Sequence, residues 1–219
     1  MPDSKSEDLV KRAAALATST LANALDLAGC HDNVIVHIKA VAPGFTFTGP
    51  AMTVKEIAGE HGEFSSEDFR VGAMIDAAQA GDIIVVDCGG TACSTWGGLA
   101  SLAAKLKGVA GLLVDGGVRD LEEMIAFDFP VFSRHMVPTT GRLRLKIEDF
   151  NVPVTIDGVT VSPGDIIRAD GTGAVSLPRR QAEEIIGIAE KLARDDAAAE
   201  DDLRAGLSFS EAMAKYSGI

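Results

Sequence analysis

The chain has 219 residues, 47% of them hydrophobic, and a mean hydropathy of +0.18, which is enough apolar material for one domain with a substantial core. A net charge of -12 and a pI near 4.7 argue against a nucleic-acid partner, because phosphate binding needs a basic surface. No apolar run reaches the roughly 18 to 20 residues that a membrane span requires, and the first seven residues lack the apolar region of a signal peptide, so we expect a cytoplasmic protein without membrane partners.

The three cysteines Cys30, Cys88 and Cys93 have neither the number for a disulfide framework nor the spacing of a zinc site. We expect buried, reduced thiols.

The first third of the chain changes from helical to extended character. Apolar residues at helical spacing predict two helices over residues 7–27, with Thr18, Ser19 and Thr20 as a cap between them. Residues 33–57 are rich in β-branched side chains and interrupted by Pro-Gly and Gly-Pro pairs, which indicates short strands and turns. Within them, FTGPAMTVKEI (47–57) is predicted to be one core strand.

The centre of the chain is predicted to be a strand, helix, strand unit. Residues 83–86 and 110–114 are short apolar runs, and between them residues 96–106 place Leu99, Leu102, Ala103 and Leu106 at helical spacing. Two strands joined in this way are parallel and usually adjacent, so the loops that follow them should meet at one edge of the sheet.

The second half is predicted to be rich in strands, at residues 131–132, 152–156, 159–161, 166–168 and 174–177. Pro178 should open a long helix through Leu192, followed by an acidic helical stretch. We therefore divide the chain into a single domain over residues 1–192 and a C-terminal helical arm over 193–219, which has the character of a segment that packs on a neighbouring subunit.

Chemistry is concentrated in the two central loops. The loop CGGTACSTWGG after the first strand is rich in small residues, and Gly97, Gly98, Leu99 and Ala100 would supply the unpaired amides at the helix N-terminus, a group that binds anions. The loop after the second strand carries Arg119 and Asp120. An arginine can bind a carboxylate with two hydrogen bonds, and an aspartate can hold a hard divalent cation.

A carboxylate held beside a metal-bound keto oxygen describes a 2-oxo acid, and a metal at that place would stabilise the enolate formed by aldol cleavage or decarboxylation. The competing interpretation is a surface turn with a loose Arg119–Asp120 ion pair, since neither glycine loops nor an Arg-Asp pair is specific by itself.

The composite of GDIIVVDCGG, WGGLASLAAKLKGVAG, LLVDGGVRDLEE and FPVFSR is more specific. It resembles the family of class II 4-hydroxy-4-methyl-2-oxoglutarate / 4-carboxy-4-hydroxy-2-oxoadipate aldolases and the regulator of ribonuclease E activity, and the likeness extends from TSTLANALD to PGDIIRADGTGAVSLP. The resemblance implies an α/β fold, a swivelling-domain-like layered sandwich of β-sheets and helices, assembled as a homotrimer or a dimer of trimers with active sites between subunits.

The same resemblance implies roles for individual residues. The segment Gly97 to Ala100 would bind pyruvate through its amides, Arg119 would bind substrate, and Asp120 would hold Mg²⁺ or Mn²⁺. An acidic side chain from the neighbouring subunit's C-terminal region would approach the metal-bound waters, and Asp196 or a neighbour is the nearest candidate.

One departure from the family matters. Its aldolases have an acidic residue 21 positions before the arginine, where it handles protons, and this chain has Gly98 there. Three explanations stay open: another residue substitutes, the substrate differs, or aldolase activity is weak. His61 and Glu63 in the loop GEHGEFSSED are candidate substitutes, against the alternative of a solvated loop, and Asp87 is another, against the alternative of a turn residue.

Other conspicuous residues have ordinary interpretations beside functional ones. Trp96 could wall a pocket or serve as a buried anchor, and Arg134 could line the site or a subunit contact. Cys88 and Cys93 border the glycine loop without a nearby base, and the histidines lack metal-ligand spacing.

The leading hypothesis is a divalent-metal-dependent lyase that cleaves a 4-hydroxy-2-oxo acid to pyruvate and a second carbonyl compound, with oxaloacetate decarboxylation as a side activity. Two alternatives stay open: a non-catalytic, protein-binding regulator of the ribonuclease E inhibitor type, and a lyase or isomerase that acts on a different hydroxy acid. The sequence does not distinguish between substrates, between Mg²⁺ and Mn²⁺, or between trimer and hexamer.

Overall fold

The structure is a computed structural model that describes residues 4–216. Residues 1–3, in the segment that we expected to lack a signal peptide, lie outside the described residues. So do residues 217–219, at the end of the C-terminal arm. The described helices are α1 (Ser4–Ala14), α2 (Thr18–Leu27), α3 (Val71–Ala77), α4 (Gly98–Lys107), α5 (Leu121–Ala126), α6 (Ala182–Arg204) and α7 (Phe209–Lys215).

The described strands form one large mixed sheet and a separate hairpin. The sheet has the order β1-β12-β11-β3-β4-β6-β7-β2, with β5 on β6 and β8 on β3 at its margins, and the hairpin pairs β9 with β10. The strands are β1 (Val34–Ile35), β2 (Lys39–Ala40), β3 (Phe47–Ala58), β4 (Ile83–Asp87), β5 (Ser94–Trp96), β6 (Gly111–Val118), β7 (Val131–Met136), β8 (Leu145–Phe150), β9 (Val154–Ile156), β10 (Val159–Val161), β11 (Ile166–Asp170) and β12 (Gly173–Leu177).

Parallel strands form the middle of the sheet. β3, β4, β6 and β7 run parallel in that order, while β11 and β12 join antiparallel at one side. β4 is buried along its whole length because both faces of the sheet are covered, and this explains why its sequence, IIVVD, is continuously apolar until its last residue. Ile84 and Val86 face one core, and Ile83 and Val85 face the other.

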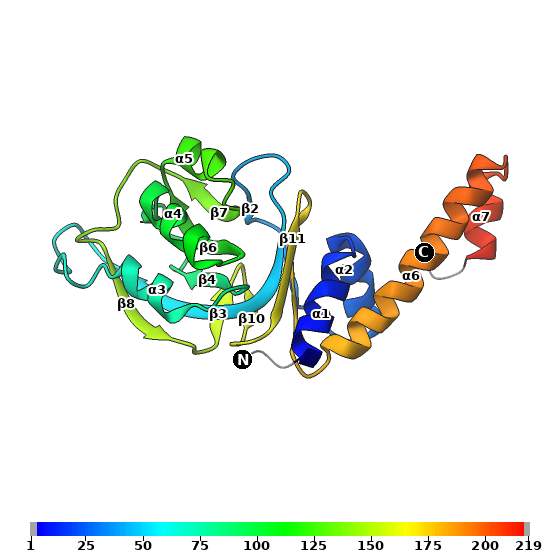
Figure 1. The fold of residues 1–219 in the computed structure, drawn as a ribbon, viewed down its shortest axis with the longest axis horizontal. Coiled ribbons are helices and arrows are strands. Elements are labelled where there is room, and N and C mark those ends of the chain that lie inside the picture. Colours follow the sequence, from blue (N-terminus) through cyan, green and yellow to red (C-terminus); the bar gives the residue numbers. More distant parts are fainter. Residues whose placement is uncertain (1–3, 217–219) are drawn as a thin grey trace.

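Each face of the sheet has its own cover. Helices α3, α4 and α5 lie over one face, where Met74, Ala104 and Met124 join the core, and the β9–β10 hairpin closes the opposite face (Figure 1). A third core, around Leu21 and Ile186, holds α1, α2 and the first part of α6 against β11 and β12. This arrangement confirms the predicted layered α/β class.

The end of the chain projects from this body. α6 runs without a break through the 192/193 position, and its second part and α7 extend away from the sheet (Figure 1). α7 folds back on α6, where Lys215 Nζ lies 2.6 Å from Asp202 Oδ2 and the Tyr216 hydroxyl donates a hydrogen bond to the same carboxylate. Among residues 4–216, no helix combines the length and the apolar character that crossing a membrane requires.

Several local predictions need correction. α2 begins at Thr18, its N-cap is Ala17, and no side chain caps it; the Thr18 hydroxyl instead donates to Asp170. α6 begins at Ala182 rather than at Pro178, and it is one helix rather than two stretches. The predictions also missed α3, α5 and β8, which are short and lack a strong apolar period.

The central unit differs in one informative way. β4 and β6 are parallel neighbours, as predicted, but β6 continues through Gly116 and Gly117 to Val118 instead of ending at residue 114. A Cβ on Gly117 would lie 2.7 Å from the carbonyl oxygen of Cys93, and one on Gly116 would lie 2.7 Å from Cβ of Cys88. The two glycines therefore allow the glycine loop and β5 to pack directly on the strand.

Candidate active site

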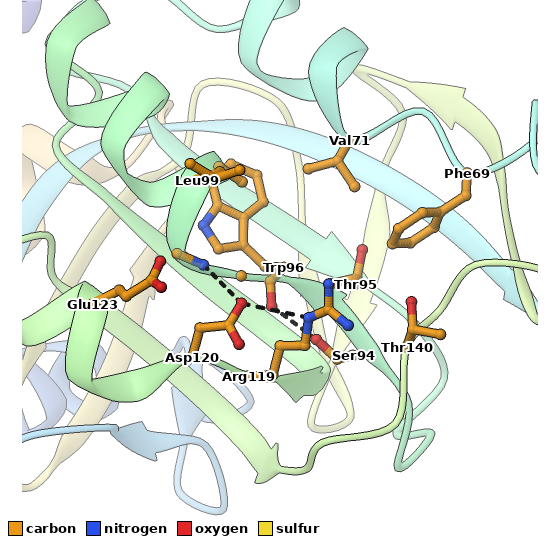
Figure 2. A pocket seen from close by; sticks show the side chains of 13 residues that line it. Phe69, Val71, Ser94, Thr95, Trp96, Leu99, Arg119, Asp120, Glu123 and Thr140 are labelled. Carbon is orange, nitrogen blue, oxygen red and sulfur yellow. Dashed lines mark hydrogen bonds and ion pairs between the residues drawn. The ribbon is translucent and has the colours of Figure 1, made fainter.

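A pocket of about 310 Å³ opens where β5, α4 and the loop after β6 meet. The loop after β4 and the loop after β6 come together here, as the parallel arrangement of their strands predicts. Figure 2 shows the lining side chains converging from these elements. The lining consists of Phe69, Val71, Ser94, Thr95, Trp96, Gly97, Gly98, Leu99, Ala100, Arg119, Asp120, Glu123 and Thr140.

Trp96 forms a rigid wall beneath the start of α4. It belongs to β5, just before α4, and only 1% of its surface is exposed. Its indole stacks on Phe129 with a centroid separation of 6.3 Å, and its Nε1–H donates to the Ser101 hydroxyl at 2.9 Å. The residue is therefore both a buried anchor and part of the pocket wall.

The N-terminus of α4 faces the pocket without a capping side chain of its own. Gly97 is the N-cap, and the Gly98 N–H donates to Asp120 Oδ2 at 3.2 Å. The amides of Leu99 and Ala100 follow in the first turn, where N–H groups have no partner inside the helix. Contrary to the prediction of four open amides, the Gly98 amide is thus already occupied by Asp120.

Asp120 is held in an unusual backbone conformation. Its φ of 60° and ψ of 48° are left-handed, a region that residues other than glycine seldom adopt, and such strain clusters at functional sites. It is the N-cap residue of α5, yet its carboxylate makes no cap hydrogen bond to that helix and turns instead to α4. The left-handed backbone thus aims the carboxylate at the pocket.

Arg119 and Asp120 form a weak ion pair at the mouth of the pocket. Arg119 Nε lies 3.5 Å from Asp120 Oδ2, and 43% and 42% of the two side chains are exposed. A pair this open and this long contributes little to stability. Both side chains therefore remain available to a ligand.

Glu123 is a pocket residue that we did not predict from the sequence. It lies in the first turn of α5, one helical turn after Asp120, and its carboxylate points toward the N-terminus of α4 (Figure 2). The signal was present in the spacing, since a helix that begins just after Asp120 places residue 123 on the same side. That helix was itself not predicted. Phe69 and Thr140, which lie in loops distant in the sequence, carried no comparable signal.

The proposed substitutes for the acid missing at Gly98 lie elsewhere. His61 and Glu63 are exposed in a loop that does not line the pocket. Asp87 is buried at the end of β4, where its carboxylate pairs with Lys55 Nζ at 2.8 Å and accepts the N–H of Thr155. Asp196 is exposed on α6 and does not line the pocket of its own chain.

Arg134 has a structural role within the chain. Its guanidinium pairs with Asp115 at 2.5 Å and with Asp157 at 2.7 Å, and these hydrogen bonds raise its pKa. Asp157 lies between β9 and β10, so the cluster ties the hairpin to the end of the parallel sheet. Arg134 is thus committed to this network and does not line the pocket.

A buried carboxyl group lies behind the pocket. Glu56 on β3 is 1% exposed, and its Oε2 accepts a hydrogen bond from the Cys88 thiol at 3.0 Å. Burial raises the pKa of Glu56 to about 6, while Cys88 and then Thr95 act in the opposite direction. Burial also raises the pKa of the Cys88 thiol, which makes that cysteine unreactive rather than catalytic.

The donor set suits a hard divalent cation only in part. Among residues 4–216, no group of three or more His, Cys, Asp or Glu side chains is arranged to hold a metal ion. Mg²⁺, however, is commonly held by one or two carboxylates, with waters and substrate oxygens filling the other positions. Asp120 offers such a carboxylate at the mouth of the pocket, so the residues fit a metal that substrate and water complete.

A mixed sheet with a glycine-lined pocket at the carboxyl ends of its central parallel strands defines a layered α/β protein. Residues 18–176 match the family described as RraA-like, Aldolase/RraA, and the chain belongs to this family. A relative from Halalkalibacterium halodurans, named "Putative 4-hydroxy-4-methyl-2-oxoglutarate aldolase", is 31% identical over 94% of this chain and 95% of its own length.

Two solved structures support the same fold. An uncharacterized protein from Pseudomonas syringae pv. tomato superposes with a TM-score of 0.88 at 27% identity, covering 99% of this chain and 96% of its own. RraAS2 from Streptomyces coelicolor is described as an unusual member of the RNase ES inhibitor RraA protein family. It superposes with a TM-score of 0.76 at 29% identity, covering 93% of this chain and 97% of its own. This chain spans only 47% of the length of one further curated relative and 27% of the length of another.

Proposed function

We propose that the protein is a divalent-metal-dependent carbon-carbon lyase that cleaves a 4-hydroxy-2-oxo acid to pyruvate and a second carbonyl compound. The observation that carries the proposal is the convergence of the α4 amides, Arg119 and Asp120 in one pocket. The family and the name of the Halalkalibacterium halodurans relative favour the same chemistry.

The proposed roles follow from charge and position. The substrate carboxylate would lie at the first-turn amides of α4, where the helix dipole favours an anion, and the Arg119 guanidinium would clamp it with two hydrogen bonds. Asp120 would hold Mg²⁺ or Mn²⁺. The cation supplies positive charge that stabilises the negative charge developing on the 2-oxygen. Oxaloacetate has the same 2-oxo acid group, so its decarboxylation is proposed as a side activity.

The buried wall of Trp96 would keep water from one side of this group, because its indole is fixed by the Phe129 stack and by the hydrogen bond to Ser101. Exclusion of water strengthens each electrostatic interaction inside a site. The open side of the pocket, beyond Leu99, would receive the part of the substrate that differs between hydroxy acids.

Arg119 and Asp120 variants test these roles. Arg119→Ala should lower kcat/KM for cleavage by about 10- to 100-fold, the cost of losing a charge-assisted hydrogen-bond pair. Asp120→Ala should remove the dependence on metal together with the activity. Steady-state pyruvate release measures both. An unchanged rate for Arg119→Ala at limiting substrate, or activity of Asp120→Ala that a chelator still abolishes, would refute the assignment.

We further propose that the chain acts as a homotrimer or a dimer of trimers in the cytoplasm. Leu99 and Leu106 on α4 are 81% and 79% exposed, although their spacing is that of a packed apolar helix face. The core side of α4 is instead lined by Gly98, Ser101 and Ala104. A second copy of the chain would cover the exposed side, and its C-terminal arm would bring Asp196 or a neighbouring acid to the pocket.

A regulator that binds protein is the second candidate. It is favoured by the likeness to Streptomyces coelicolor RraAS2, whose family is described as RNase ES inhibitors, and by a net charge of -12, which suits a basic partner. Complete inertness of the metal-loaded protein toward 2-oxo acids, together with binding to a ribonuclease E-type enzyme, would favour this candidate. A lyase or isomerase on a different hydroxy acid would instead show metal-dependent turnover without pyruvate.

A further inference from the structure

Glu123 occupies the space that a side chain at position 98 would fill. A Cβ built on Gly98 would lie 2.7 Å from Cβ and 2.5 Å from Cδ of Glu123, and closer still to its Oε2. Real Cβ atoms essentially never lie within 3.0 Å of another residue's atoms, so position 98 must be glycine while Glu123 holds this conformation. A carboxylate from α5 therefore stands at the N-terminus of α4, beside Asp120 (Figure 2).

This carboxylate is not used by the rest of the fold. Within residues 4–216, no group donates a hydrogen bond to the Glu123 side chain or pairs with it, and that side chain is exposed to the pocket. The neighbouring Glu122 is also exposed but does not line the pocket. A free acid aimed into a ligand pocket is available to act on a ligand.

The pocket contains few alternatives for proton transfer. Of the described residues that line it, only Arg119, Asp120 and Glu123 are ionisable. The guanidinium of Arg119 is a hydrogen-bond donor without an acceptor site, and Asp120 is assigned to the cation. Glu56 is buried and does not line the pocket, so it does not reach a substrate. Cleavage of a 4-hydroxy-2-oxo acid needs a base for the 4-hydroxyl group, and among the lining residues of one chain Glu123 is the group left for that task.

We infer that Glu123 is the base that removes the proton of the substrate's 4-hydroxyl group. The inference rests on the proposed function and adds a residue to it. The Glu123 carboxylate takes the hydroxyl proton, the C4–O bond becomes a carbonyl, and the C3–C4 bond breaks. Its electron pair forms the C2–C3 double bond of the pyruvate enolate. The protonated Glu123 then returns the proton to C3, giving pyruvate and an unchanged enzyme.

Oxaloacetate provides an internal control for this role. Its decarboxylation breaks a carbon-carbon bond with CO₂ as the leaving group, so no hydroxyl proton has to be removed. Its bond cleavage depends on the carboxylate and cation subsites alone, and the pyruvate enolate that remains takes its C3 proton from water. The two reactions therefore separate a proton-transfer role of Glu123 from a role in building the pocket.

The experiment compares wild type, Glu123→Gln and Glu122→Gln on a 4-hydroxy-2-oxo acid and on oxaloacetate, each with Mg²⁺. Glutamine keeps the size of the side chain but cannot accept the proton. We expect aldol cleavage by Glu123→Gln to fall by about 100-fold or more, the usual contribution of a general base, while oxaloacetate decarboxylation stays near the wild-type rate. Glu122→Gln should match wild type in both reactions.

A second variant pair moves the carboxylate between helices. Glu123→Ala should lose cleavage, and adding Gly98→Asp to it should restore part of the lost rate, because the new carboxylate enters the space that Glu123 leaves. Gly98→Asp alone should disturb the pocket, since Glu123 still fills that space. Thermal unfolding of each variant checks that the fold survives.

The outcomes are distinct. Cleavage by Glu123→Gln at the wild-type rate, or equal losses in both reactions, would overturn the role of Glu123 while leaving the lyase intact. A wild-type protein inert toward both substrates would overturn the proposed function and, with it, this inference.

Discussion

At the scale of single residues, Glu56 links burial to pH-dependent stability. Its carboxyl group is 1% exposed, and its Oε1 has no hydrogen-bond partner among the described residues, so ionisation inside the fold is costly. The pKa of the group is raised from 4.5 to about 6 in the folded state. A raised pKa means that the folded state binds the proton more tightly than the unfolded state does.

The raised pKa of Glu56 makes the folded protein less stable as the pH rises. The stabilising contribution is fully present below the unfolded pKa of 4.5 and is lost as pH rises through the folded pKa of about 6. The shift corresponds to about 2 kcal/mol of unfolding free energy. Glu56→Gln cannot ionise, so relative to wild type it should become more stable by about 2 kcal/mol as the pH rises from about 4 to about 7.

Urea unfolding of both proteins at several pH values measures this difference, in which the other titrating groups largely cancel. A difference in unfolding free energy that stays constant with pH would show that Glu56 does not carry a raised pKa in the folded protein.

Only some of the pocket residues could be placed from the sequence. The positions of Arg119 and Asp120 beside the start of α4 follow from strand order, because the ends of adjacent parallel strands meet. The left-handed conformation of Asp120 and the place of Glu123 do not follow from it. They depend on α5, a helix of six residues whose sequence, LEEMIA, is too short to show a clear period.

At the scale of elements, Gly98 and Glu123 set the contact between α4 and α5. The Gly98→Ala change should be costly in wild type, because the new methyl group meets Cβ of Glu123, which cannot swing away as a side-chain tip can. In a Glu123→Ala background the space is open, and alanine at a helix start is tolerated well.

We therefore expect a coupling of about 1 to 3 kcal/mol in a double-mutant cycle of unfolding free energies for Gly98→Ala and Glu123→Ala. Gly187→Ala on α6, where an added Cβ meets nothing within 4 Å, is the matched glycine control. Additive effects of the two pocket changes would contradict the packing described here.

The elements themselves were predictable to different degrees. The core strand β3 was found almost to its ends, and β10 was found at its observed bounds. The apolar spacing on α4 correctly predicted a helix, but it does not mark the buried face, since Leu99 and Leu106 point outward. An apolar stripe predicts a face that packs on another surface, and the sequence of one chain does not show whether that surface is its own sheet or another subunit.

At the scale of the whole molecule, the exposed side of α4 and the projecting arm predict an assembly. Sedimentation velocity of the wild type should give a trimer or hexamer, and Leu106→Lys, at the end of α4 away from the pocket, should shift it to smaller species. Lys105→Ala on the same helix is a control at an exposed position. A monomeric wild type would contradict the prediction and would leave the pocket to be completed by a single chain.

The proposed lyase breaks a carbon-carbon bond of a 2-oxo acid in this pocket with the help of a divalent cation. The most direct measurement is pyruvate release by the wild-type protein from a panel of 4-hydroxy-2-oxo acids and oxaloacetate, with Mg²⁺, with Mn²⁺ and with a chelator. We expect release that requires metal and disappears in Asp120→Ala. Release that persists in the chelator, or none from any substrate with either metal, would contradict it.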